Sequence, residues 1–550
     1  GSSVRVYSRS FRCAGNMGDN EEWPEDETTS DPVLPRPVTL EINPSENLAE
    51  TGGESKVAVN IQVPDSVDDC RASSDICCVI DISGSMGELA TYEQDGVSRH
   101  DGLTILDIVK HAVKTIVHTL KDVDRFALIA FDDAADRVLN LTDMTEEGKT
   151  RAIEAIDGLM PRGRTNIWGG VLEGMEALQA SEIKGRQGSL LLLTDGLPNI
   201  SPPRGHIAEL RDYKEKHPDL ALQISTFGFG YSLDSELLLD LAVEGNGTYA
   251  FIPDAVIVGT AFVNAVANSL SALTQDATLH LKAVNGAAIT GPVADFTVAE
   301  ATWGHVVSLG PLQLGQTREV VVPMRIPGGS APFLEATLSY VNFRGQKDQI
   351  VHEAAERSAT QVAIFAAARS ETVTRGYQAV KDACGGRGKS AQQSVNDLAQ
   401  AFASYETASA NLGSGTAEAR LVSLKNDVEG RMSKAFKGKE RFNRWGKHYL
   451  RALMRAHQVQ QCTNFMDPGL QAYAGRLFSS LRSTGEQVFV SLPPPKPSKA
   501  LPPVPLPQRT APPPQATYNY TPPAPLAAPV VTSRPSSPDM HTYIGGGGGG

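Results

Sequence analysis

The pattern of apolar and polar positions changes along the chain. Apolar residues occupy every second position of Val57–Val63, which predicts a half-buried strand, and Val38–Ile42 predicts a neighbouring strand. From about residue 75 to 272, continuous apolar runs such as Ile76–Ile80 and Phe126–Phe131 are typical of parallel strands buried on both faces. Between these runs, apolar residues three and four apart predict helices, most clearly in Leu103–Leu120. The alternation predicts an α/β fold with a doubly wound, mostly parallel, Rossmann-like sheet.

The same reasoning predicts the other elements of this region and a second group of strands after it. In the α/β region we expect strands at Arg137–Leu141, Leu190–Leu193 and Leu222–Phe227, and helices at Glu146–Leu159, Ile167–Gln179, Ile207–Lys216 and Ser235–Val243. Further strands are expected at Ala277–Ala283, Val306–Leu309, Arg318–Ile326 and Phe333–Phe343. Arg137–Leu141 is short and fits the edge of the sheet. The later strands could form one β-sandwich with those before residue 63.

Changes in composition divide the chain into six segments. The expected organisation is a disordered acidic segment at 1–36, sandwich strands at 37–70, the α/β domain at 73–272, the β-sandwich at 273–352, a helical region at 353–490 and a disordered Pro- and Gly-rich tail at 491–550. The first and last segments contain too few apolar residues to form a packed core.

One uncharged stretch is long enough to resemble a membrane span. It comprises the 21 residues between Asp254 and Asp276. Thr260, Asn264 and Asn268 recur in it at helical spacing and make one face polar. We therefore expect an amphipathic helix that covers the sheet, and no membrane span.

Charge and cysteine content narrow the class of protein. With 50 Lys and Arg against 63 Asp and Glu, the net charge is −13, which argues against a general nucleic-acid binder. Six Cys are too few for a disulfide scaffold. The adjacent Cys77 and Cys78 are interpreted as reduced core thiols, which favours a cytoplasmic, intracellular protein.

The residues best suited to chemistry follow the predicted core strands. Asp81, Ser83 and Ser85 come directly after the first core strand, and Asp195 ends another. Thr165 opens a predicted helix. Because the carboxyl ends of parallel strands share one edge of the sheet, these five oxygen-bearing side chains should converge. An all-oxygen set suits a divalent cation, most readily magnesium, with manganese and calcium as alternatives.

These motifs resemble a known metal site. Asp-x-Ser-x-Ser at 81–85, a distant Thr and Thr-Asp-Gly at 194–196 are similar to the metal-ion-dependent adhesion site (MIDAS) of von Willebrand factor type A (VWA) domains, over about residues 73–272. The resemblance implies that Ser83, Ser85 and Thr165 contact the metal and that Asp81 and Asp195 act mostly through bound water. It also implies a protein partner whose acidic residue completes the coordination.

The sequence departs from the usual VWA pattern at the expected rim of this site. An insertion, Gly87–Gly102, precedes the first helix and either contacts the partner or occupies the open metal position itself. Asp132 follows a core strand and is expected near the metal, more simply as a loop residue than as a ligand. The candidate rim residues are therefore Glu88, Glu93, Asp95, Asp101 and Asp132.

Two longer stretches resemble a subgroup of intracellular VWA proteins. One is the phrase GLTILDIVKH at 102–111, and the other is Arg451–Pro468, which is similar to the helical region known as Vwaint. Some members of the subgroup carry a Hint autoprocessing domain or a zinc module of ubiquitin ligases. We expect neither in this sequence, because it has no cysteine cluster and no unassigned segment of sufficient length.

The leading functional hypothesis is a metal-dependent protein-binding scaffold that is not an enzyme. An adaptor in the ubiquitin system is the alternative, by analogy with the zinc-bearing relatives. A metal-dependent hydrolase is disfavoured, because haloacid-dehalogenase-type phosphatases need an Asp where Ser83 stands.

Two other surfaces suggest partners. Residues 431–457 are rich in Lys and Arg with interleaved aromatic residues, which would suit an acidic partner, a nucleic acid or a phosphoinositide; a solvated or intramolecular basic face is the simpler interpretation. In the tail, Lys499, Pro502 and Pro505 fit a ligand of a polyproline-binding domain.

Overall fold

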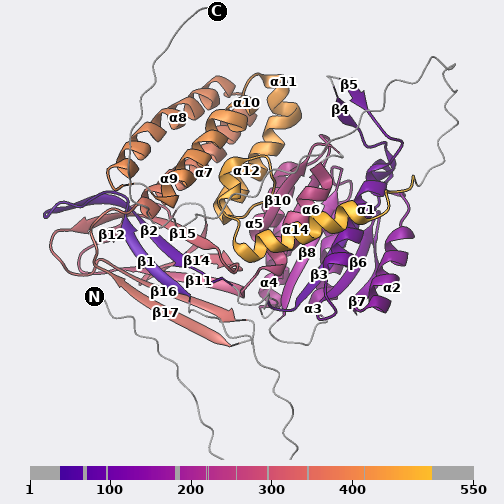
Figure 1. The fold of residues 1–550 in the computed structure, drawn as a ribbon, viewed down its shortest axis with the longest axis horizontal. Helices are drawn as coiled ribbons and strands as arrows, with labels where there is room; N and C mark the ends of the chain where they lie inside the picture. Colours follow the sequence, from indigo (N-terminus) through magenta and orange to yellow (C-terminus); the bar gives the residue numbers. More distant parts are fainter. Residues whose placement is uncertain are drawn as a thin grey trace, which may run out of the picture. The chain divides into compact units, whose positions relative to one another are not determined.

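The computed structural model describes residues 38–497 except 66–70, 95–96, 180–185, 219, 221, 255–256, 294–295, 343–345 and 414. These residues build an α/β part, a part with two antiparallel sheets and a helical part (Figure 1). The predicted fold class is confirmed.

The α/β part is organised around a six-stranded sheet with the order β10-β9-β8-β3-β6-β7. Every neighbouring pair is parallel except β6 and β7, so β7 forms an antiparallel edge, where the sequence predicted an edge strand. The strands are β3 (Ser74–Asp81), β6 (Arg125–Phe131), β7 (Ala135–Asp143), β8 (Gln187–Thr194), β9 (Leu222–Phe229) and β10 (Asn246–Ile252).

Helices cover both faces of this sheet. One face packs against α1 (Ile105–Thr119), α2 (Glu146–Asp157) and α6 (Val258–Leu270), and the other against α3 (Ile167–Gln179), α4 (His206–Lys216) and α5 (Ser235–Glu244). Cys77 and Cys78 are free and buried, and each packs into a different one of these two cores.

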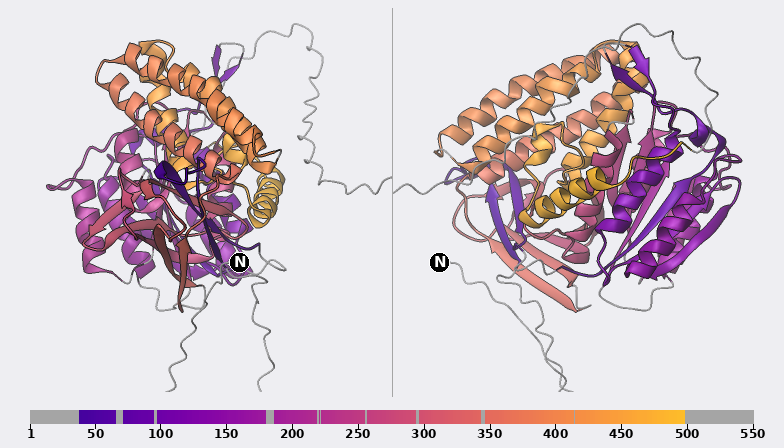
Figure 2. Two further views of the ribbon diagram at one scale, coloured as in Figure 1. Left: turned by 90° about the vertical axis from the view of Figure 1, so that its left-hand side faces the viewer. Right: turned by 45° about the vertical axis from the view of Figure 1, so that its right-hand side comes forward.

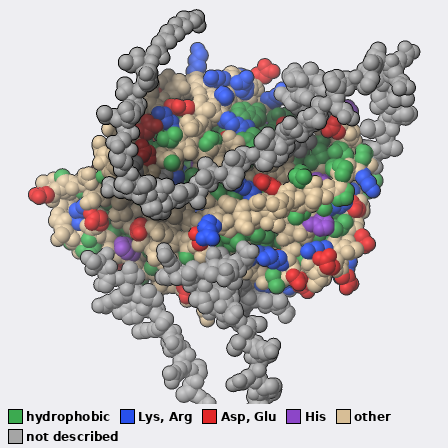
Figure 3. All heavy atoms as spheres, in the orientation of Figure 1, with side chains coloured by type: hydrophobic (Ala, Val, Ile, Leu, Met, Phe, Trp, Pro, Cys, Tyr) green, Lys and Arg blue, Asp and Glu red, His purple; other side chains and the backbone are tan. Residues whose placement is uncertain are grey.

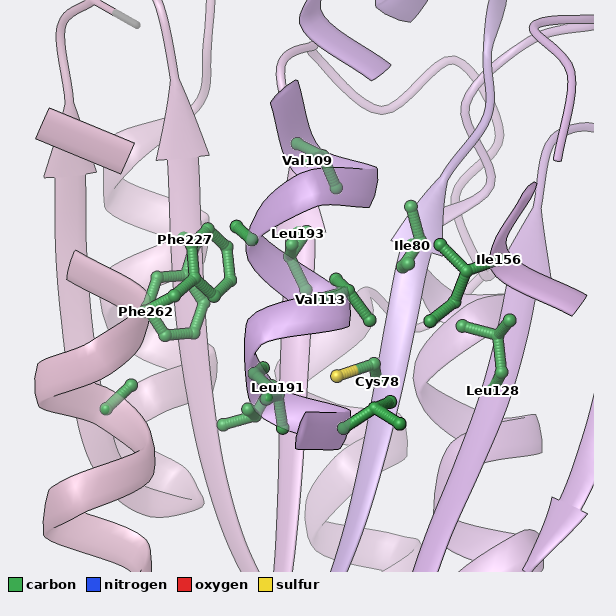
Figure 4. Packing of buried hydrophobic residues seen from close by; sticks show 14 of the residues in the cluster. Cys78, Ile80, Val109, Val113, Leu128, Ile156, Leu191, Leu193, Phe227 and Phe262 are labelled. Atoms are coloured by element: carbon green, nitrogen blue, oxygen red, sulfur yellow. The ribbon is translucent and has the colours of Figure 1, made fainter. Parts of the chain in front are cut away.

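The α1–α6 face shows how the sheet is stabilised. Val109 and Val113 of α1 lie over Cys78 and Ile80 of β3, next to Leu191 and Leu193 of β8 (Figure 4). The rings of Phe227 and Phe262 stack there with centroids 4.7 Å apart. Each fully buried side chain of this size contributes roughly 1.5–3 kcal/mol. The sheet is therefore a rigid frame for the loops at its carboxyl edge.

The two antiparallel sheets form a sandwich from segments on either side of the α/β part. One sheet has the order β1-β2-β15-β12 and the other β13-β14-β11-β16-β17, and both contribute to one apolar core. As the sequence suggested, β2 pairs with β15 along its whole length. The strands are β1 (Thr39–Pro44), β2 (Gly52–Gln62), β11 (Thr274–Ala283), β12 (Ala288–Ile289), β13 (Thr297–Ala301), β14 (Gly304–Gly310), β15 (Thr317–Pro327), β16 (Leu334–Asn342) and β17 (Lys347–Ala354).

The helical part begins with two long helices and returns to the α/β part at its end. It contains α7 (Gln361–Cys384), α8 (Gly388–Ala410), α9 (Thr416–Asp427), α10 (Ser433–Ala435), α11 (Lys439–Arg441), α12 (Lys447–Val459), α13 (Pro468–Gln471) and α14 (Arg476–Ser491), with π-helical turns at Val428–Met432 and Phe442–Gly446. Figure 2 shows α14 lying along the helices of the α/β part, and Arg482 of α14 also donates to Gln471 of α13 at 3.1 Å.

Two glycines allow α14 to approach α6 closely. A Cβ atom on Gly259 would lie 2.5 Å from the Phe489 ring, and one on Gly485 would lie 2.9 Å from Val263. Phe489 also meets the ring of His111 on α1, with centroids 4.7 Å apart. The helix α14 thus covers the outer surface of the layer formed by α1 and α6.

The structure adds strands to the sequence analysis and corrects one helix. Among the strands of the three sheets above, β10, β12, β13 and β17 were not predicted. The helix α6 covers the sheet as expected, but its polar residues Asn264 and Asn268 are buried, and Asn268 Nδ2 donates to the backbone oxygen of Cys462 at 3.0 Å. None of the described helices is both long enough and apolar enough to cross a membrane.

Candidate metal centre

The ends of β3 and β8 bring two carboxylates to one edge of the sheet. Asp81 is the last residue of β3, and Asp195 follows Thr194, the last residue of β8. The two strands are parallel neighbours with Ile80 opposite Leu193, so Asp81 lies beside Thr194. Thr194 Oγ1 donates to Asp81 Oδ2 at 2.5 Å, which fixes the carboxylate.

The loop after β3 turns its two serines toward Asp195. The backbone N–H of Ser83 donates to Asp81 Oδ1 at 2.8 Å, which closes the turn. The hydroxyl oxygens of Ser83 and Ser85 lie 3.1 Å apart, and Ser85 Oγ donates to Asp195 Oδ1 at 2.7 Å. Asp81, Ser83, Ser85 and Asp195 thus form one connected group.

Thr165 joins this group from a third loop. The loop is held by backbone hydrogen bonds from Gly84 N to Gly163 O and from Asn199 N to Thr165 O. A Cβ atom on Gly196 would lie 3.5 Å from Thr165 Oγ1 and 3.7 Å from Ser85 Oγ, so both hydroxyls flank Gly196. The structure therefore places all five predicted side chains at one edge of the sheet.

The electrostatics of the group favour a cation. Burial raises the pKa of Asp195 to about 7, and the negative charges of Asp81 and Glu88 add to this increase, although the hydrogen bond from Ser85 opposes it. Burial also raises the pKa of Asp81, against its hydrogen bonds from Thr194 and Ser83. Among the described residues, no Lys or Arg forms an ion pair with either carboxylate. Two carboxylates with three hydroxyls are a donor set that fits a hard divalent cation.

The candidate rim residues differ in their surroundings. Asp132 is buried, and its carboxylate accepts from Arg162 Nε at 2.7 Å and from the backbone N–H of Ala134 at 3.1 Å, so it serves the loop. It nevertheless lies close enough to Asp81 to raise the pKa of that carboxyl. Glu88 and Asp101 are exposed.

The insertion contains two short paired strands, β4 (Tyr92–Gln94) and β5 (Val97–Arg99). Leu89 forms a β-bridge with Thr104, the residue that caps α1. Asp95 and the side chain of Glu93 lie outside the described residues, as do Lys499, Pro502 and Pro505 of the expected polyproline ligand.

Two residues near the group were not singled out from the sequence. Thr194 orients Asp81, and the Thr-Asp-Gly motif already contained it. Leu197 follows Asp195 by two positions and is 56% exposed. The only feature of the sequence that could have indicated Leu197 is its position directly after the Thr-Asp-Gly motif.

Comparison with known families agrees with this architecture. Residues 75–258 match the model of the von Willebrand factor type A domain, and residues 418–487 match the model described as VWA / Hh protein intein-like, Vwaint. The chain thus contains both kinds of domain that the sequence motifs indicated. A von Willebrand factor type A structure from Catenulispora acidiphila superposes with a TM-score of 0.51 at 17% identity, covering 68% of this chain and 88% of that one. This likeness concerns the fold alone.

Two curated proteins of Arabidopsis thaliana are similar in sequence. The probable E3 ubiquitin-protein ligase WAVH2 is 23% identical over 58% of this chain, and the E3 ubiquitin-protein ligase WAV3 is 25% identical over 47%. The matches span 43% and 31% of the lengths of these relatives. The expectation that the chain is not an enzyme is contradicted by this comparison, because both relatives are named as ligases, which are enzymes.

Proposed function

We propose that the chain binds a partner protein through a divalent cation at the metal centre. Ser83, Ser85 and Thr165 would hold the cation directly, and Asp81 and Asp195 would hold it mostly through water. The cation would supply an open position for an acidic residue of the partner. The observation that supports this most strongly is the connected group of two buried carboxylates and facing hydroxyls, which lacks a cationic partner among the described residues.

The geometry suits binding at the edge of the sheet. The backbone of Ser83 is held by Asp81, the hydroxyl of Ser85 is held by Asp195, and the two serine hydroxyls lie 3.1 Å apart, so these oxygen atoms are already arranged before a cation binds. Few carboxylates surround the cation, so its charge is only partly neutralised and an anionic ligand is favoured. The chemistry is that of magnesium, with manganese or calcium as alternatives.

We further propose that this binding serves ubiquitin transfer, with the VWA domain holding a target protein. The similarity to WAVH2 and WAV3 supports this, over the part of those proteins that the chain matches. In this proposal the protein works in the cytoplasm, where thiols such as Cys77 and Cys78 stay reduced.

The test is partner capture with and without the cation. Wild type and Asp195→Asn are immobilised, cell lysate is applied in magnesium or in EDTA, and bound proteins are identified by mass spectrometry. Partners should be retained by wild type in magnesium and lost in EDTA and on Asp195→Asn. They should also accumulate ubiquitin conjugates in cells that contain the wild type. An identical set of bound proteins in all four samples would refute the role of the metal centre.

A further inference from the structure

A short basic segment, residues 431–447, lies in the helical part. It contains seven Lys and Arg residues and a single acidic residue, Glu440, in a chain whose net charge is −13. The exposed cations are Lys434, Lys437, Lys439, Arg441 and Arg444. In the described part of the chain, Lys434, Lys437, Lys439 and Arg441 have no carboxylate within ion-pair distance. Figure 3 shows Lys and Arg side chains gathered where α10 and α11 lie in Figure 1.

The apolar side chains of this segment and the helix after it explain why the cations stay outside. Phe436 and Phe442 are buried and stack with ring centroids 5.6 Å apart, and Tyr449 is buried beside Trp445. The two buried arginines that follow on α12 have structural roles. Arg451 pairs with Glu236 at 2.9 Å, and Arg455 Nε donates to the backbone oxygen of Gly247 at 2.8 Å. The basic stretch seen in the sequence therefore consists of an intramolecular half and an exposed half.

The exposed half adjoins the edge of the sheet that carries the metal centre. The Arg444 guanidinium lies 5.0 Å from the centre of the Tyr231 ring, and Tyr231 lies two residues after the end of β9. His448 stacks on Phe251 at the end of β10, with ring centroids 5.4 Å apart. Since β8, β9 and β10 are parallel neighbours, their carboxyl ends share the edge where Asp195 stands. Strands lie about 4.8 Å apart, so the ends of β9 and β10, which the basic segment and α12 contact, lie roughly 5 and 10 Å from the end of β8.

We propose that the metal centre and the basic segment form one docking surface for an acidic protein segment with several carboxylates. One carboxylate would bind the cation, and those that follow would lie against Lys437, Lys439 and Arg441. An extended chain covers about 3.3 Å per residue, so acidic residues roughly three to six positions apart would reach both. The proposal rests on the proposed function, and adds to it the chemical class of the partner and a second contact region.

Charge complementarity favours an acidic polypeptide over other anions. A divalent cation also binds phosphate oxygens, so the charges around the metal centre decide between a carboxylate and a phosphate ligand. Glu88 and Asp101 of the insertion are exposed and acidic, and the negative charge of Glu88 acts on Asp195. A continuous phosphate backbone or a flat anionic membrane would be repelled there, whereas a short acidic segment can pass along the basic side alone.

The experiment compares two fluorescent peptides on the full chain. One peptide carries a single Asp in a Gly/Ser sequence, and the other carries the same Asp followed by five Glu. The test variant is Lys437→Gln/Lys439→Gln/Arg441→Gln. The matched control is Lys121→Gln/Arg151→Gln/Lys347→Gln. It removes the same charge from three exposed positions, which lie after α1, on α2 and on β17, respectively. Affinities are measured by fluorescence anisotropy in magnesium and in EDTA.

In magnesium, the peptide with six acidic residues should bind the wild type more tightly than the peptide with one. The test variant should lose about tenfold in affinity for it, because each exposed charge pair contributes a factor of roughly 1.5–5. Affinity for the single-Asp peptide should not change, and the control variant should behave like wild type. EDTA should weaken both peptides.

Other results would overturn the proposal in distinguishable ways. If EDTA weakens binding but the test variant equals wild type, the proposed function stands and the basic segment has no part in it. If the test variant loses affinity but EDTA has no effect, the metal centre is not part of the surface and the proposed function fails with it. No binding of either peptide, or tighter binding of a thymidine oligonucleotide or of vesicles with phosphatidylinositol bisphosphate, would also overturn it.

Discussion

Magnesium should raise the melting temperature of the wild type, and the substitution Asp195→Asn should abolish most of this increase. The substitution preserves the shape of the side chain, and the amide oxygen can still accept the hydrogen bond from Ser85. It removes one of only two carboxylates in the connected group. A loss of response would therefore reflect the site and not the fold.

The size of the effect follows from mass action. A cation present at one hundred times its dissociation constant stabilises the native state by about 2.7 kcal/mol. For an α/β part of this size, 1 kcal/mol shifts the melting temperature by about 2–4 °C, so the wild type should gain about 5–10 °C.

The two proteins should also differ in the absence of the cation, in EDTA. The pKa of Asp195 is raised from 3.8 to about 7, so between these values the unfolded chain loses a proton that the folded chain keeps. The free energy of unfolding of the metal-free wild type therefore falls as the pH rises from about 4 to 7, by up to about 4 kcal/mol. Asn carries no charge and removes this loss, so Asp195→Asn should melt at or above the wild-type temperature in EDTA near neutral pH.

The assay is differential scanning fluorimetry over a magnesium titration, with Asp133→Asn as the matched control. Asp133 lies near the same edge but is half exposed and pairs with Arg164, outside the connected group. This control should respond to magnesium as the wild type does. An equal magnesium shift in wild type and Asp195→Asn would refute the assignment of the site.

Three further predictions concern the frame around the site. Glu319→Gln should lower the free energy of unfolding, measured in urea, by about 3–5 kcal/mol. Glu319 is fully buried, and the equally buried Arg369, 3.6 Å away, would lose its counter-charge. A loss no larger than that of Lys282→Gln, which breaks an exposed ion pair, would count against this. Burial lowers the pKa of His448 from 6.5 to about 4, and the positive charges of Lys447 and Arg451 add to this decrease. Between these two pH values only the unfolded chain binds the proton. The free energy of unfolding should therefore fall by up to about 3 kcal/mol as the pH drops through that range. His448→Phe keeps the stack on Phe251 and should remove this part of the acid sensitivity, which thermal melts across the range would detect. A chain that begins at residue 70 lacks β1 and β2, exposes the β15 edge and should aggregate in size-exclusion chromatography with light scattering; a monomer as stable as the longer chain would contradict the role of these strands.

The sequence was sufficient to predict the α/β frame and the five side chains of the candidate centre. Runs such as Ile76–Ile80 and Phe126–Phe131 require burial on both faces, and this is satisfied only inside a parallel sheet covered by helices. Once the strands are known, their carboxyl ends share an edge, so Asp81 and Asp195 must come together although they are far apart in sequence. The spacing from Asp81 to Ser85 is local and is set by a single turn.

Contacts between distant segments could not be predicted in the same way. The polar residues Asn264 and Asn268 suggested a polar helix face, but both are buried, and Asn268 donates to the backbone oxygen of Cys462 in the loop after α12. The strand β10 is a short segment that starts at Asn246 in a left-handed conformation and has a register shift, so its pattern is weak, and its place at the sheet edge depends on pairing with β9 and on α12 beside it.

The basic stretch shows the same division most clearly. Its composition predicted a charged face, but the sequence could not separate Arg455, which is buried against the backbone of β10, from Lys437, which remains exposed. A helical period determines which residues share a face, because that depends only on the backbone geometry of the helix. Which neighbour covers the face depends on packing between segments hundreds of residues apart, and only the tertiary structure decides that.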